Sequence, residues 1–122
     1  MTFWAVSDVN PAEMKAFAAR TRRMADGLCA ALDALDVDVR IALLHYAPVA
    51  ETLTGERLEL FPFLGSEVLG RAIDAVGADL ALHGHAHYGS EEGVTPGGVV
   101  VRNVAQPVIA APYRIFAFAE DK

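Results

Sequence analysis

The sequence has a single cysteine, Cys29, and little that suggests a membrane, an export signal or a nucleic-acid surface. One thiol excludes an intrachain disulfide and is typical of proteins in a reducing compartment. No apolar run approaches the length of about 20 residues that spans a bilayer, and no charged-then-apolar leader is visible. The formal net charge of −6 argues against a surface that grips phosphate backbones. We therefore expect a cytoplasmic protein with no membrane segment and no nucleic-acid surface.

The length of 122 residues predicts a single domain, residues 1–122, that can bury its own core. Apolar periodicity and turn residues predict two helices, the first capped by Asn10 and the second by Ser66. Strands are predicted before His45, at Leu80–His83 and at Val99–Val104, and alternating residues suggest another at Tyr113–Ala119. The order helix, strand, helix, strand and then an antiparallel run of strands predicts an α/β fold.

Histidine is concentrated where two of the predicted strands end. His83, His85 and His87 occupy alternate positions after the apolar run Leu80–Leu82, and His45 follows the run Ile41–Leu44. Ligands of open α/β sheets bind at the carboxyl ends of the strands. The sequence therefore predicts one site, assembled from both strand ends at one edge of the sheet.

Imidazole is the commonest protein ligand for zinc, manganese and iron-type metals. Residues two apart on an extended strand point to the same face, so the rings of His85 and His87 could lean towards a shared metal site. A lone histidine at a strand end is more often structural. Three within five positions, together with His45, favour a metal site.

At these positions the sequence resembles the calcineurin-like metallophosphoesterases. Gly84-His85-Ala86-His87 resembles that family's Gly-His-x-His signature, and His45-Tyr46-Ala47-Pro48 resembles the histidine motif that precedes it. Residues 93–105 are similar to the family's C-terminal strands, so the resemblance covers the chain from about His45 onward. It implies part of an α/β/β/α sandwich, with two helices and mixed or antiparallel strands.

The resemblance also implies an activity, the hydrolysis of small phosphate mono- or diesters at a centre of two divalent metal ions (Mn, Fe or Zn). His45 and His85 would ligate one ion and His87 the other. His83 occupies no motif position and is expected to be a strand residue or to orient a ligand.

The family's upstream motifs, Asp-x-His, Gly-Asp-x-x-Asp and Gly-Asn-His, have no clear counterpart. No Gly-Asp pair and no Gly-Asn-His occurs, and the stretch from Asp8 to Asn10 resembles Asp-x-His only with asparagine in the histidine place. The chain therefore resembles the C-terminal half of a metallophosphoesterase, with an incomplete active site and no confident catalytic residue. Its partner is expected to be the missing N-terminal half or a second copy of the chain.

Two alternatives stay open. His83-x-His85-x-His87 is similar to the histidine-triad nucleotide hydrolases, but that family has large apolar residues between its histidines, where this chain has Gly84 and Ala86. The chain could also be a non-catalytic metal-binding or association fragment.

Three further residues are candidates near the predicted site. Tyr46 and Tyr88 flank the histidines and would either touch substrate or pack as aromatics at strand ends. Asn103, at the end of a predicted strand, is a candidate for supporting a ligand.

Overall fold

The structure is a computed structural model that describes residues 11–118, with side chains from residue 15 onward. Asp8 and the predicted cap Asn10 therefore lie outside the described residues. The elements in chain order are α1 (Pro11–Asp33), β1 (Ile41–Leu44), η1 (Glu51–Leu53), η2 (Leu58–Leu60), α2 (Phe61–Leu64), α3 (Glu67–Val76), β2 (Leu80–His83), β3 (Glu92–Val94), β4 (Val100–Asn103) and α4 (Gln106–Ile109). The predicted mixed α/β class is confirmed.

The strands form one four-stranded sheet in the order β1-β2-β4-β3. β1, β2 and β4 are parallel, and only β3 runs antiparallel, in a hairpin with β4. The predicted antiparallel run after β2 is therefore wrong for β4. The connection from β1 to β2 contains η1, η2, α2 and α3, and is long enough for a parallel crossover.

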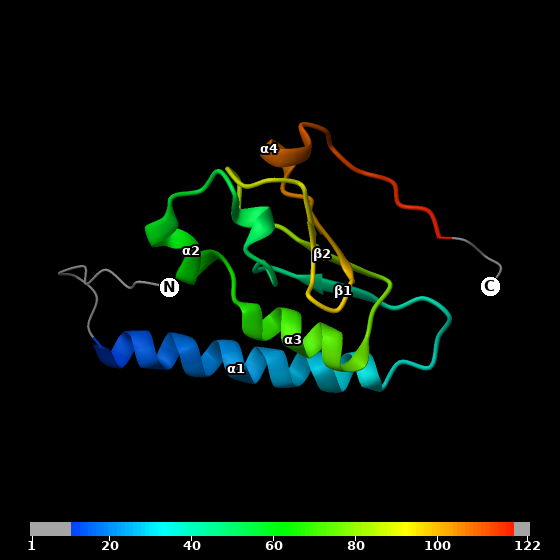
Figure 1. The fold of residues 1–122 in the computed structure, drawn as a ribbon, viewed down its shortest axis with the longest axis horizontal. Helices are drawn as coiled ribbons and strands as arrows, with labels where there is room; N and C mark the ends of the chain where they lie inside the picture. The colour runs from blue at the N-terminus through cyan, green and yellow to red at the C-terminus, as the bar shows by residue number, and fades with distance from the viewer. Residues whose placement is uncertain (1–10, 119–122) are drawn as a thin grey trace.

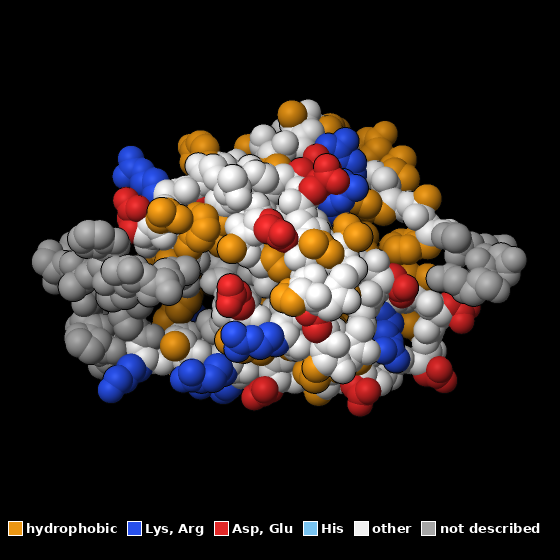
Figure 2. Space-filling model, in the orientation of Figure 1, with side chains coloured by type: hydrophobic (Ala, Val, Ile, Leu, Met, Phe, Trp, Pro, Cys, Tyr) orange, Lys and Arg blue, Asp and Glu red, His pale blue; other side chains and the backbone are white. Residues whose placement is uncertain are grey.

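Helices α1 and α3 pack against each other and cover one face of the sheet (Figure 1). Side chains alternate along a strand, and those of Ala42, Ala81 and Val101 point towards the helices. They meet Leu32 of α1 and Ile73 of α3 in the main core. Figure 2 shows charged side chains along the lower edge of the molecule, over the outer side of α1.

Helix α3 begins where its sequence predicts. The Ser66 side chain accepts a hydrogen bond from the backbone N–H of Val68, as an N-cap does, and Gly77 follows the last residue with φ of 97°. This cap fixes the start of the helix that delivers the chain to β2.

The opposite face of the sheet is partly open. Ile41, Leu43 and Val100, which we call the open face, expose 43%, 76% and 44% of their surface. β1 also stands at an edge of the sheet. An apolar face beside an edge strand is typical of a surface that binds another polypeptide.

The alternating residues Tyr113–Phe118 do not form the predicted strand. Tyr113 and Ile115 are exposed, while Arg114 pairs with Glu91 at 2.9 Å and the Phe116 ring lies under the Arg102 guanidinium. These side-chain contacts hold the segment without a backbone ladder. Alternation alone therefore does not make this segment a strand, because side-chain contacts set its position.

Candidate functional site

The three parallel strands end at the same edge of the sheet. Leu44 of β1 lies opposite His83 of β2, and His83 lies opposite Asn103 of β4. His45 follows β1 directly, and His85 follows β2 after one glycine. The ends of β1 and β2, each followed by a histidine, therefore lie at one edge of the sheet.

The imidazole rings of His45 and His85 contact each other. Their centroids are 4.5 Å apart and their planes are tilted by 34°. Tyr46 packs edge-on against both, with ring centroids 4.9 Å from His45 and 5.3 Å from His85. Tyr46 therefore packs as an aromatic beside the two rings. His45 is exposed and His85 half-buried, so a ligand can reach both.

His87 and Tyr88 are exposed beyond this pair. Within residues 11–118, no three side chains of His, Cys, Asp or Glu gather as metal ligands would. The reason lies in the backbone after β2, where Ala86 N–H donates to Gly84 O and His87 N–H donates to His85 O. These consecutive tight turns end the strand alternation that would have pointed His85 and His87 the same way.

The backbone at His85 is in an unusual conformation. Its φ is +68°, and the peptide groups on either side are joined by the 2.7 Å bond from Ala86 N to Gly84 O. A three-residue turn with positive φ at its centre is rare and strained, and strain of this kind, of order 1–3 kcal/mol, concentrates at functional sites. It persists only where the surroundings hold it in place.

His83 points away from the pair into the interior. Its side chain is fully buried, with Nδ1 2.8 Å from Gly84 O and Nε2 2.7 Å from the Thr52 hydroxyl. A carbonyl only accepts, so Nδ1 carries the proton and Nε2 accepts from Thr52. Burial lowers the pKa of His83 below its ordinary 6.5, against the raising effect of the Gly84 hydrogen bond, and the neighbouring His85 lowers it further. His83 is therefore a neutral, internal imidazole.

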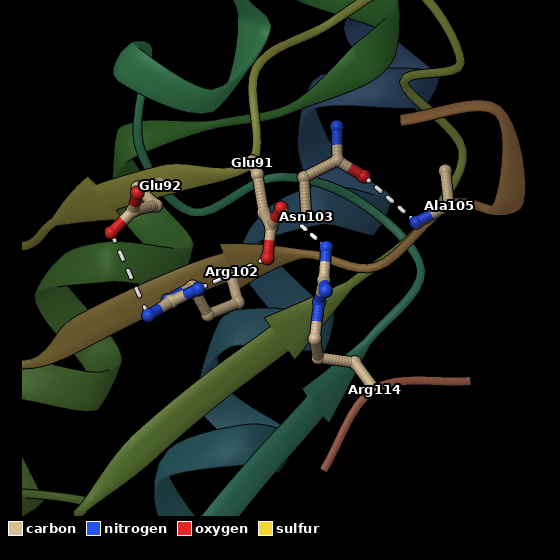
Figure 3. Close-up of polar contacts among 6 residues, drawn as sticks. All are labelled: Glu91, Glu92, Arg102, Asn103, Ala105 and Arg114. Carbon is tan, nitrogen blue, oxygen red and sulfur yellow. Dashed lines mark hydrogen bonds and ion pairs between the residues drawn. The ribbon is translucent and has the colours of Figure 1, made fainter. Parts of the chain in front are cut away.

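Asn103 is also fully buried and holds the histidine loop, which we define as residues 84–91. Its Nδ2 donates to Ala86 O at 2.9 Å. Its Oδ1 accepts from Ala105 N–H at 3.1 Å, as Figure 3 shows. Its own N–H donates to Glu91 O. The side chain thus ties the end of β4 to the loop that carries His85.

Sequence reasoning did not single out Thr52, which lies within η1 against the histidine loop. Its carbonyl accepts from Ser90 N–H at 3.0 Å, while Ser90 Oγ donates to Thr54 O and Glu56 accepts from Tyr88 N–H. The connection from 46 to 65 is long for a compact domain, and long connections are often functional. Nothing in its composition marks Thr52 above its neighbour Thr54.

Glu91, at the end of the histidine loop, pairs with Arg102 at 3.0 Å and with Arg114 at 2.9 Å, and Arg102 also approaches Glu92 (Figure 3). Both glutamates form ion pairs with arginines. We therefore assign them a structural role at the end of the histidine loop.

No family model, curated protein or solved structure matches this chain. Among the described residues, no helix has both the length and the apolar character needed to cross a membrane.

Proposed function

We propose that this chain supplies the histidine ligands of a metal-dependent phosphoesterase site. The observation that carries the proposal is the contact between His45 and His85, which follow neighbouring parallel strands at one edge. Two accessible imidazoles at this edge are what a shared metal ion requires, and the order of the two motifs matches the resemblance.

His45 and His85 are close enough together to serve one ion. Zinc–nitrogen bonds are about 2.0–2.1 Å long, so two imidazoles that bind one ion lie close together. The rings of His45 and His85 are already close, with centroids 4.5 Å apart. By the resemblance, His87, whose side chain is exposed, would serve a second ion. Two such ions, manganese, iron or zinc, would activate water and stabilise charge on the phosphoryl oxygens of a small phosphoester.

The remaining donors would come from a second polypeptide segment. The described residues gather no third donor beside His45 and His85, and the open face and the free side of β1 lie next to His45. A segment that adds strands beside β1 would cover Ile41 and Leu43 and bring its own side chains to the same edge. We propose a segment bearing the family's Asp, Asn and His motifs, with a second copy of this chain as the alternative occupant.

One observation favours a non-catalytic role for the chain by itself. Two imidazoles without a neighbouring carboxylate bind a metal weakly and provide no acid for a leaving group. We therefore expect the isolated chain to hold a metal and turn over very little. The triad hydrolase is less favoured, because His83 is buried against Thr52 and unavailable to a substrate.

The test measures hydrolysis of bis(p-nitrophenyl) phosphate with Mn²⁺ or Zn²⁺, by the chain alone and joined to a segment that carries the three upstream motifs. The chain alone should stay near background, and the joined protein should turn over, stop on chelation, and lose activity in His85→Ala and in His87→Ala. Recovery of a phosphorylated histidine from the unaided chain in the presence of chelator would overturn the proposal and support the triad.

A further inference from the structure

The strained turn at His85 is held from both sides by buried side chains. Gly84 O, before the turn, accepts from His83 Nδ1 at 2.8 Å, and Ala86 O, after it, accepts from Asn103 Nδ2 at 2.9 Å. His83 and Asn103 are both fully buried and lie opposite each other on β2 and β4. The turn is thus held at the carbonyl groups of the two residues that flank His85.

Both His83 and Asn103 form a hydrogen bond with the same residue, Thr52. Its hydroxyl bonds Nε2 of His83 at 2.7 Å, and its carbonyl accepts from Asn103 Nδ2 at 3.4 Å and from Ser90 N–H at 3.0 Å. Thr52 is itself fully buried. The hydroxyl bond fixes the ring of His83 so that Nδ1 faces Gly84 O, since a neutral imidazole has one donor and one acceptor.

The packing around Thr52 leaves little room for adjustment. A Cβ on Gly89 would lie 2.2 Å from the Thr52 carbonyl oxygen, and a Cβ on Gly93 would lie 3.1 Å from the Thr52 methyl group. The histidine loop and β3 therefore approach Thr52 closely on two sides. The hydroxyl alone can be removed, by exchange for valine, without changing this shape.

We propose that Thr52 is a positioning residue that, through His83 and Asn103, holds His85 in its strained turn facing His45. The purpose of this arrangement, the presentation of two imidazoles to one ion, rests on the proposed function. The hydrogen bonds that hold His85 are all made by residues of this chain and can be tested without a metal ion. Ligand-orienting partners of this kind typically change metal affinity by about 10- to 100-fold when they are removed.

Three variants of the full chain test the assignment. Thr52→Val removes the hydroxyl and keeps the shape, Thr52→Ser keeps the hydroxyl, and Thr54→Val makes the same exchange at an exposed neighbour. The first readout is the intraresidue NOE between the amide proton and Hα of His85, which is strong only where φ is positive. The second is the imidazole nitrogen spectrum of His83, which reports the protonated nitrogen. The third is Zn²⁺ affinity by calorimetry.

Thr52→Val should weaken the His85 NOE, mix the His83 tautomers and lower Zn²⁺ affinity by about 10-fold or more, whereas Thr52→Ser and Thr54→Val should resemble the original protein. If Thr52→Val fails to fold, Asn103→Ser, which removes the other clamp, should give the same NOE change. An unchanged NOE and tautomer in a folded Thr52→Val would overturn the positioning role. Absence of Zn²⁺ binding by the unaltered chain would instead count against the proposed function, and the NOE would still decide the role of Thr52.

Discussion

The ring of His45 lies against the ring of His85, with 4.5 Å between their centroids, although the two residues follow different strands. The parallel pairing of β1 with β2 brings the strand ends together, and the turn at His85 directs the second ring towards the first. The site therefore depends on the sheet register and on the shape of the histidine loop. These two requirements lead to separate predictions.

The histidine loop needs a glycine at position 55. Gly55 has φ of 114°, and a Cβ there would lie 2.3 Å from the carbonyl oxygen of Tyr88. Gly55→Ala should lower the free energy of unfolding by about 1–3 kcal/mol, measured by urea denaturation. Gly27→Ala, in the interior of α1 with no atom near its new Cβ, should raise it by about 0.5–1 kcal/mol. Equal effects of the two exchanges would contradict the close approach at Gly55.

The parallel strands and helix α3 could be predicted because local signals and burial agree there. The runs before His45 and His83 are continuous apolar stretches, and Ser66 is a capping residue before a periodic segment. These elements also fixed the edge at which the histidines meet. That part of the site followed from strand order alone.

The side-chain arrangement beyond the strand ends could not be predicted in the same way. Whether His85 and His87 share a face depends on the turns after Gly84, and those turns are set by Asn103 and Thr52 from distant parts of the chain. The C-terminal residues from Tyr113 have a strand-like pattern, but their position is set by the pairing of Arg114 with Glu91. Contacts of this kind leave no local signal in the sequence.

Stability should depend on pH through His83. Its pKa in the folded protein is below 6.5, so between that lower value and 6.5 the unfolded chain binds more protons. The contribution of neutral His83 to stability is complete above pH 6.5 and is lost as the pH falls through 6.5 towards the folded pKa. Over that range this residue changes the free energy of unfolding by at most about 1.4 kcal/mol per pH unit. Urea denaturation from about pH 7.5 to about pH 5.5 covers the range.

His83→Gln is the matched variant, because glutamine does not titrate and still offers a donor and an acceptor. We expect it to be less stable near neutral pH and to show a flatter dependence on pH. A profile as steep as that of the unaltered chain would mean that the buried imidazole is not the group responsible.

The open face should matter for association and little for folding. Leu43→Glu should change the free energy of unfolding of the chain by less than about 0.5 kcal/mol, because the side chain is 76% exposed. The same exchange should prevent association with a segment that carries the missing motifs, measured by sedimentation and by recovery of activity. Leu58→Glu, at a leucine 74% exposed on η2, is the control and should leave association intact. Normal association of Leu43→Glu would argue against strand addition beside β1.

The most direct test of the shared histidine site is calorimetric titration of the full chain with Zn²⁺, in the unaltered form and in His45→Ala, His85→Ala and His87→Ala. We expect one ion per chain, bound more weakly as the pH falls through the histidine range, since a protonated imidazole does not ligate. His45→Ala and His85→Ala should each reduce affinity by about tenfold or more, because each removes half of the ring pair. Binding that survives both exchanges, or that depends on His87 alone, would contradict a site shared between His45 and His85.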